Sequence, residues 1–218
     1  MLPLQDSYKH KGLRQKLVTI LKEKGITNST VLEAINTLPR HYFLDSAFQE
    51  LAYEDRAFPI GEEQTISQPY TVAYQTQLLQ LQPNHKVLEI GTGSAYQACI
   101  LALCKAQVYS IERQKKLYEK NKKFKYLLTY SNLKLFYGDG FAGLPTYAPW
   151  DRVIITAAAP IIPPMLIAQL KPGGIMVIPY GMGTEQMMQR ITKHTDGSLV
   201  TEQFEAFSFV PMLQGKAT

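Results

Sequence analysis

The sequence predicts an α/β protein built on a Rossmann-like, doubly wound and mostly parallel sheet. From residue 86 onward, strand-like apolar runs alternate with stretches of helical periodicity, as in parallel strands joined by helices. The first run ends in a glycine turn, Gly91-Thr92-Gly93, that leads into a helix. The next run ends in a carboxylate, Glu112. A glycine turn and a carboxylate at two neighbouring strand ends indicate a nucleoside site there.

Residues 1–60 predict a helical cap and connector without catalytic character. Residues 11–24 place apolar side chains at helical spacing. A second helix is expected to begin at Asn28 or Ser29 and to end before Pro39. This part of the chain is therefore expected to pack on the sheet rather than to carry chemistry.

The length of 218 residues, with 45% hydrophobic and 19% charged residues, is that of a globular chain with a sizeable core. We expect a single domain over residues 1–218. In it, residues 1–60 would form the cap and connector, and residues 61–218 the nucleoside-binding core.

Ser67 lies between the cap and the sheet and has two possible roles. With Pro69 in the first turn, it is suited to the N-cap of a helix that runs to Leu81. A serine hydroxyl and the free amides of a helix N-terminus can also hold an anion. Spacing alone favours the cap and leaves the anion site open.

The core is expected to hold a parallel sheet that antiparallel strands close at one edge. Five strand-like runs are followed by two more: Lys86–Ile90, Gln107–Glu112, Leu133–Tyr137, Asp151–Thr156, Gly174–Pro179, Gln186–Lys193 and Phe204–Met212. Helical stretches are expected at 94–104, 113–129 and 164–170. Ligands of such folds bind beyond the carboxyl ends of the strands.

Glu89 indicates which class of nucleoside the site binds, because this carboxylate lies two residues before the first glycine of the turn. A carboxylate beside a pyrophosphate would be repelled by about 1 to 4 kcal/mol, and the third glycine of a dinucleotide fingerprint is Tyr96 here. A cationic ligand such as S-adenosylmethionine would be attracted. Asp139, in Gly138-Asp139-Gly140, is either an ordinary Asp-Gly turn or a contact to adenine.

Six short motifs occur in the order typical of protein-L-isoaspartate O-methyltransferases, which this sequence resembles from about residue 27 to 212. They are Gln64-Thr65-Ile66-Ser67-Gln68-Pro69-Tyr70, the glycine turn, Gly138-Asp139-Gly140, Thr156-Ala157-Ala158-Ala159-Pro160, Gln169-Leu170-Lys171-Pro172-Gly173-Gly174 and Phe209-Val210-Pro211. The resemblance implies a class I methyltransferase fold. It also implies methyl transfer from S-adenosylmethionine, with S-adenosylhomocysteine as product, to the α-carboxyl of isoaspartyl residues in damaged proteins.

The resemblance assigns the residues to two groups. Donor-binding positions would be Gln64, Thr65, Ile66, Glu89, Gly91, Thr92, Gly93, Ser94, Gln97, Glu112, Arg113, Asp139 and Gly140. Substrate-binding positions would be Ser67, Ala157, Ala158, Ala159, Pro160 and Val210, with Ser67 as the catalytic residue that orients the substrate carboxylate.

The chemistry requires little from the protein beyond alignment. A carboxylate with a pKa of about 3.5 to 4 is ionised at neutral pH and needs no general base. Alignment and exclusion of water can supply on the order of 7–11 kcal/mol. The four histidines are scattered, so we expect no metal site.

Ala95 is the one departure from the family pattern, which commonly has glycine there. We expect Ala95 to be the first or second helical residue, where alanine is well tolerated. A methyl group pointing at the donor would instead lower donor affinity. A donor-binding module without turnover is therefore a rival hypothesis.

Two other enzyme classes fit the sequence less well. A nucleic-acid amino-methyltransferase usually has Asn/Asp-Pro-Pro-aromatic where this chain has Thr156–Pro160, and Glu89 disfavours a nicotinamide oxidoreductase.

The basic run 113–125 is typical of a solvated helix face, so no nucleic-acid partner is expected. Without a signal peptide or an apolar span, we expect a cytoplasmic monomer with no membrane contact.

Overall fold

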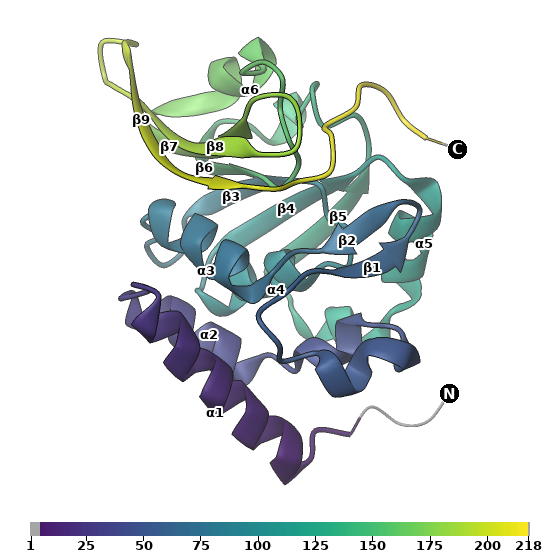
Figure 1. Cartoon of the computed structure of the whole chain (residues 1–218). Coiled ribbons are helices and arrows are strands. Elements are labelled where there is room, and N and C mark those ends of the chain that lie inside the picture. The colour runs from purple at the N-terminus through teal and green to yellow at the C-terminus, as the bar shows by residue number, and fades with distance from the viewer. Residues whose placement is uncertain (1–4, 218) are drawn as a thin grey trace.

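The computed structural model describes residues 5–217 and contains a seven-stranded sheet with the order β5-β4-β3-β6-β7-β8-β9 (Figure 1). The strands are β3 (Lys86–Ile90), β4 (Gln107–Glu112), β5 (Leu133–Tyr137), β6 (Trp150–Ile155), β7 (Leu170–Tyr180), β8 (Gln186–Lys193) and β9 (Leu199–Phe207). The first five are parallel, whereas β8 and β9 add antiparallel neighbours. The predicted fold class is therefore confirmed.

Strand β3 is the point at which the strand order reverses. It pairs with β4 on one side, where Ile90 lies opposite Ile111, and with β6 on the other, where Ile90 lies opposite Ile155. The carboxyl ends of these three strands meet at one edge of the sheet. A ligand site is expected at such a switch point.

Alternate residues of each central strand enter two separate hydrophobic cores. Val87 of β3 and Ile154 of β6 belong to the larger core, whereas their neighbours Leu88 and Val153 belong to the smaller one. This separation follows from the two-residue period of a strand. Helices therefore have to cover both faces.

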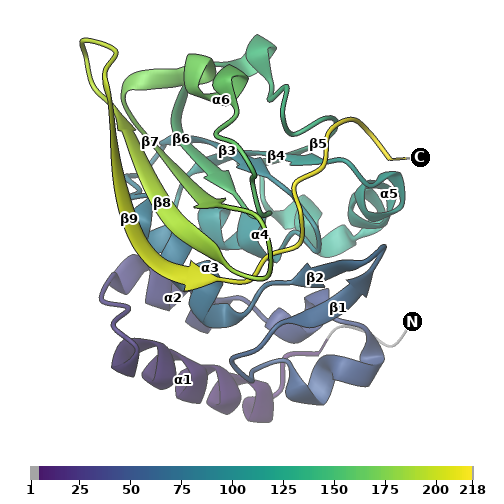
Figure 2. The same cartoon turned by 45° about the horizontal axis from the view of Figure 1, so that its top comes forward.

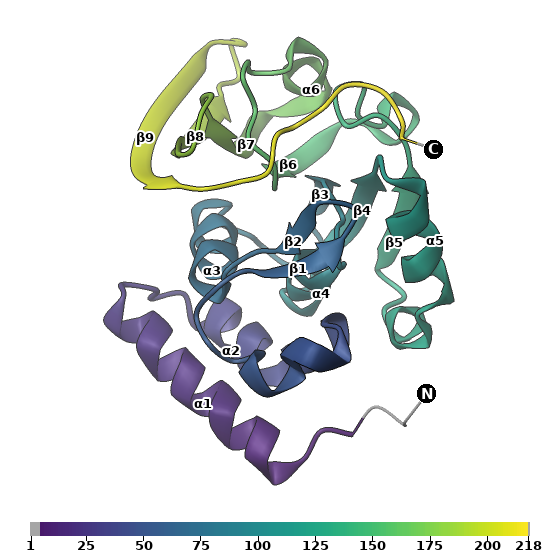
Figure 3. The same cartoon turned by 45° about the vertical axis from the view of Figure 1, so that its right-hand side comes forward.

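The helices distribute unequally over the two faces (Figure 3). They are α1 (Tyr8–Glu23), α2 (Ser29–Thr37), α3 (Pro69–Leu78), α4 (Tyr96–Leu103), α5 (Lys115–Lys123) and α6 (Pro164–Gln169). The first five contribute to the larger core, and α6 contributes Leu166 to the smaller one. The stretch predicted as one helix over 113–129 is split, because a 3₁₀ turn at Lys125–Thr129 follows α5.

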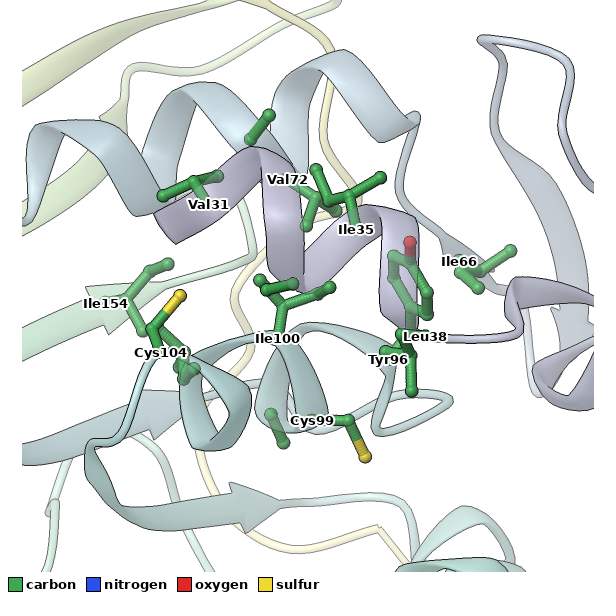
Figure 4. Packing of buried hydrophobic residues seen from close by; sticks show 14 of the residues in the cluster. Val31, Ile35, Leu38, Ile66, Val72, Tyr96, Cys99, Ile100, Cys104 and Ile154 are labelled. Carbon is green, nitrogen blue, oxygen red and sulfur yellow. The ribbon is translucent and has the colours of Figure 1, made fainter. Parts of the chain in front are cut away.

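The cap has the predicted helices and packs on α4. Asn28 is the N-cap of α2, and its side chain accepts a hydrogen bond from the Val31 amide at 3.2 Å. Ile35 of this helix lies beside Val72 of α3, and Ile100 of α4 belongs to the same buried cluster (Figure 4). The cap therefore shares the core of the sheet.

Ser67 does not cap α3, so that prediction is wrong. The helix begins at Pro69 with Gln68 at the N-cap position, and the Gln68 side chain caps none of the helix amides but donates to Asp55 Oδ2 at 3.0 Å. The free amide of Tyr70 is satisfied by Asp55, whose Oδ1 accepts it at 2.8 Å. A connector side chain, distant in sequence, supplies the cap and leaves the Ser67 hydroxyl for another role.

Two further segments differ from their predicted form. Residues Gln64–Ile66 form β2 and pair with β1 (Phe58–Gly61) as an antiparallel hairpin. The last strand begins at Leu199 and ends at Phe207, earlier than predicted. The chain then leaves the sheet and crosses toward α5 (Figure 2), and residues 208–213 are called the C-terminal strap below.

Candidate active site

A cavity of about 600 Å³ opens at the carboxyl ends of β3, β4 and β6. The β1–β2 hairpin covers its glycine turn, since a Cβ added to Gly93 would lie 3.5 Å from Ile60 Cδ1. The C-terminal strap closes another side: the Ala158 amide donates to Val210 O at 2.7 Å, and the Met212 amide donates to Ala158 O at 2.8 Å. Three distant segments of the chain thus enclose one site.

The first glycine of the turn leaves no room for a side chain. Gly91 has a φ of 98°, a left-handed conformation that favours glycine. A Cβ at this position would lie 2.6 Å from Thr156 Oγ1. The one proton of that hydroxyl is shared between Ile90 O at 2.9 Å and Gly91 O at 2.8 Å, so the hydroxyl is fixed in place. Thr156 lines the cavity and was not among the predicted site residues.

Gly93, the second glycine of the turn, forms hydrogen bonds through both its backbone amide and its carbonyl. Its amide donates to Glu112 Oε2 at 2.8 Å, and its carbonyl accepts from Asn121 Nδ2 of α5 at 2.8 Å. Glu112 also accepts the Gln114 amide at 2.8 Å through Oε1. Burial raises the pKa of this carboxyl, while its backbone hydrogen bonds lower it. Glu112 therefore faces the cavity with lone pairs suited to hydroxyl donors.

Glu89 lies beneath the glycine turn and is not on the cavity wall. It is fully buried, and Ser110 Oγ donates to its Oε2. Ser110 Oγ is in turn 2.6 Å from Thr92 Oγ1, which links the carboxyl to the turn. The other carboxylate oxygen of Glu89, Oε1, has no hydrogen-bond partner within residues 5–217. Burial, with the nearby Glu112 charge, raises the pKa of Glu89 to about 8.

Gln97 offers a second unused acceptor. Its side chain lines the cavity and is only 7% exposed. The Nε2 group donates to Thr76 Oγ1 at 2.9 Å, and Oε1 has no partner in the described part of the chain. A buried acceptor is costly to leave unpaired. A ligand with a donor group would satisfy it.

Most of the other predicted donor-binding residues line this cavity. They are Gln64, Thr65, Ile66, Thr92, Ser94, Arg113 and Gly140. Asp139 is not on the wall, and its Oδ1 accepts the Phe141 amide at 2.9 Å as in an ordinary Asp-Gly turn. Gly140 is required to be small because a Cβ there would lie 2.4 Å from Ile90 Cγ2.

The predicted substrate-side residues divide into two groups. Ser67, Ala157 and Val210 line the cavity. Ala158 and Ala159 are buried off the wall, and their backbones hold neighbouring segments: Ala158 pairs with the strap and Ala159 with Tyr180 of β7. Pro160 is exposed and also off the wall. Ala158 and Ala159 thus hold the walls in place, and Ala157 leaves space.

Ala95 has a backbone conformation that differs from the predicted helical one. It is the N-cap of α4 with a φ of 67°, in the left-handed region, and not a helical residue. Its methyl group is fully buried in the larger core and is absent from the cavity wall. The residue therefore carries backbone strain without obstructing the site.

We expect Ala95→Gly to change the free energy of unfolding by less than about 1 kcal/mol, because relief of about 1–2 kcal/mol of strain offsets the lost methyl burial and the greater chain entropy. Ala98 is an equally buried alanine inside the same helix and is the matched control. Ala98→Gly should destabilise by about 1.5–2 kcal/mol. Chemical denaturation measures both, and equal losses would contradict the strain at Ala95.

Two of the four histidines are not scattered, contrary to the sequence prediction. His10 and His41 stack with ring centroids 3.8 Å apart, and Asp6 lies beside them within reach of a shared metal ion. However, both Asp6 oxygens pair with Arg14, at 2.7 and 2.8 Å, and Tyr53 OH lies 2.6 Å from His41 Nδ1. Through these contacts the group forms a hydrogen-bonded polar cluster within the cap, and none of its residues lines the cavity.

The sheet order, the glycine turn beneath the hairpin and Glu112 at the next strand end define a nucleoside-binding protein of the class I methyltransferase type. A family model for protein-L-isoaspartate(D-aspartate) O-methyltransferase matches residues 12–217. The chain belongs to this family. No helix among residues 5–217 is long and apolar enough to cross a membrane.

Relatives cover nearly the whole chain. It is 53% identical over 210 residues to the protein-L-isoaspartate O-methyltransferase of Cytophaga hutchinsonii, covering 96% of this chain and 95% of the relative. Against that of Christiangramia forsetii it is 51% identical over 213 residues, covering 98% and 100%.

Two solved structures share the fold. One protein-L-isoaspartate O-methyltransferase is 30% identical with a TM-score of 0.82, covering 91% of this chain and 65% of that one. A second, from Plasmodium falciparum and solved with S-adenosyl-L-homocysteine, is 22% identical with a TM-score of 0.80, covering 94% and 98%.

Proposed function

We propose that this chain transfers the methyl group of S-adenosylmethionine to the α-carboxyl of L-isoaspartyl residues in damaged proteins and peptides. The observation that carries the proposal is that Ser67 and Ala157 line the same cavity as Glu112 and the glycine turn. A donor group and a peptide carboxylate can therefore meet in one enclosed space.

The cavity fits the donor on three counts. The absence of a side chain at Gly91 allows close approach to the backbone. Glu112 presents lone pairs to the ribose hydroxyls, as in other nucleoside sites of this fold. The unused Oε1 atoms of Gln97 and Glu89 are buried acceptors for the cationic α-amino end, Glu89 acting from beneath the turn.

When bound, S-adenosylmethionine supplies a methyl group activated by the sulfonium. The residues of this chain orient the substrate. The Ser67 hydroxyl would donate to one oxygen of the isoaspartyl α-carboxylate and would orient the other oxygen toward the methyl group of the bound donor. The strap and hairpin exclude water, which would compete for the methyl group.

The decisive experiment compares two peptides that differ only at one linkage. We expect methylation of an isoaspartyl peptide and little or none of the normal aspartyl peptide. The readout is transfer of labelled methyl groups together with release of S-adenosylhomocysteine. Equal methylation of both peptides would refute the proposed specificity, and donor binding without any transfer would favour a binding module.

For Ser67→Ala we expect kcat for the isoaspartyl peptide to fall at least about tenfold, because the substrate carboxylate loses its orienting donor. The affinity for S-adenosylhomocysteine should stay within about twofold. Ser208, on the strap, lines the same cavity, and Ser208→Ala is the matched control with nearly unchanged kcat. A Ser67 variant with wild-type kcat would remove this role.

The proposal includes a monomer that works in the cytoplasm without nucleic acid. The free, buried Cys99 and Cys104 accord with a reducing compartment. The lysines of α5 lie on an exposed face away from the cavity wall, as expected for a solvated helix.

A further inference from the structure

The charged residues on the cavity wall form two groups, of which one is purely acidic. Four of the wall residues are charged: Glu112, Arg113, Glu185 and Glu205. The first two follow β4 at the proposed donor end. The other two lie beside the start of the C-terminal strap and are both acidic; they are called the acidic rim below. Within the described chain, no basic side chain lines the wall at this end.

Backbone pairing places the two rim glutamates at the same end of the β8–β9 ladder. Gln186 of β8 pairs with Phe207 of β9, so Glu185 and Glu205 each lie within two residues of the same register position. Gln186 Oε1 accepts the Phe209 amide at 2.9 Å, which ties the start of the strap to the start of β8. The backbone that carries the acidic rim is therefore held in place by strand pairing and by this hydrogen bond.

Glu205 is also connected to the substrate side. The Tyr70 hydroxyl donates to Glu205 Oε2 at 3.0 Å, and Tyr70 lies three residues after Ser67. Lys24 lies over the Tyr70 ring but is paired with Asp55 at 2.6 Å. Its charge is thus compensated elsewhere.

Both rim glutamates are exposed and free to act on a ligand. Neither forms an ion pair with any residue of the described range 5–217. Exposed charges interact with a nearby charge over about one Debye length, or 8–10 Å. Ser67 and this rim line the same cavity, so the residues that neighbour an isoaspartyl carboxylate at Ser67 would enter the field of the rim.

We propose that Glu185 and Glu205 are specificity-determining residues that favour isoaspartyl segments flanked by basic side chains and disfavour those flanked by acidic ones. The inference rests on the proposed function. The rim repels a flanking carboxylate and attracts a flanking ammonium or guanidinium group, so the effect falls on peptide affinity and leaves the methyl transfer step unchanged.

The test uses three isoaspartyl peptides of equal length with neutral, lysine or glutamate flanks. At low salt we expect kcat/KM for the lysine peptide to exceed that for the glutamate peptide by about tenfold, through KM. In the double variant Glu185→Gln, Glu205→Gln this ratio should fall to within about twofold. Salt of about 0.5 M should reduce the wild-type ratio in the same way.

Glu23, an exposed glutamate on α1 and remote from the wall, is the matched control. Glu23→Gln should keep the wild-type ratio. If the neutral peptide is methylated but the double variant keeps the lysine preference, or no preference exists, the acidic rim is refuted and the proposed function stands. If the neutral peptide is not methylated at all, the proposed function fails and the inference fails with it.

Discussion

Gly91→Ala should weaken binding of S-adenosylhomocysteine at least about tenfold and destabilise the fold by about 3–4 kcal/mol. About 1–2 kcal/mol comes from alanine at a φ of 98°. The remainder comes from the new Cβ, which would lie 2.6 Å from Thr156 Oγ1 and break its hydrogen bonds to Ile90 O and Gly91 O. Calorimetric titration and denaturant unfolding measure the two effects.

Gly25 separates the backbone effect from the collision. It has a φ of 90°, and nothing lies within 4 Å of a Cβ added there. Gly25→Ala should therefore lose only about 1–2 kcal/mol and keep the affinity for S-adenosylhomocysteine. Thr156→Ala, combined with Gly91→Ala, should recover part of the loss. A Gly91 variant no worse than the Gly25 variant would rule out the collision.

Glu89→Gln should weaken S-adenosylhomocysteine binding by about tenfold or more and abolish the proton release that accompanies it. Without ligand, burial raises the pKa of Glu89 to about 8, so the carboxyl is mostly protonated at pH 7. A cationic amino group nearby favours the ionised form, so binding releases up to about one proton. Titrations in two buffers of different ionisation enthalpy measure that proton.

The pH dependence of stability gives an independent readout for Glu89. Its pKa in the folded protein, about 8, exceeds the ordinary value of 4.5, so the folded state binds the proton more tightly than the unfolded state. Wild-type stability should therefore fall, relative to Glu89→Gln, as pH rises from about 4.5 to about 8, by up to about 1.4 kcal/mol per pH unit. The nearby Glu112 charge contributes to the raised pKa of Glu89, and Cys99, whose pKa burial raises well above its ordinary value of 9, stays protonated over this range in both proteins. Parallel curves, or an unchanged proton count, would contradict this account.

Local patterns were sufficient for the first three parallel strands, whereas β7 begins at Leu170, four residues earlier than predicted. The runs Lys86–Ile90 and Gln107–Glu112 are strands with the predicted bounds, because their apolar content and the flanking helices specify buried parallel strands locally. The glycine turn was equally readable, since the left-handed backbone at Gly91 and Gly93 is a property of the turn itself. Family motifs then indicated the donor and the substrate.

Contacts between distant segments decided the rest. Ser67 reads as a cap in isolation, yet Asp55 caps α3 from the connector, which no local signal reveals. Ala95 reads as helical, yet the tight turn between Thr92 and α4 forces it into the left-handed region.

The substrate side of the cavity depends most on tertiary structure. Thr156 becomes the steric limit at Gly91 because parallel pairing of β6 with β3 sets the two side by side. Glu185 and Glu205 reach the same edge of the cavity only through the pairing of β8 with β9. The sequence by itself thus determined the sheet, the turn and the class of ligand, which depend on short-range geometry. Only the tertiary structure decided which side chains share the cavity, because side chains far apart in the chain meet through pairing and packing.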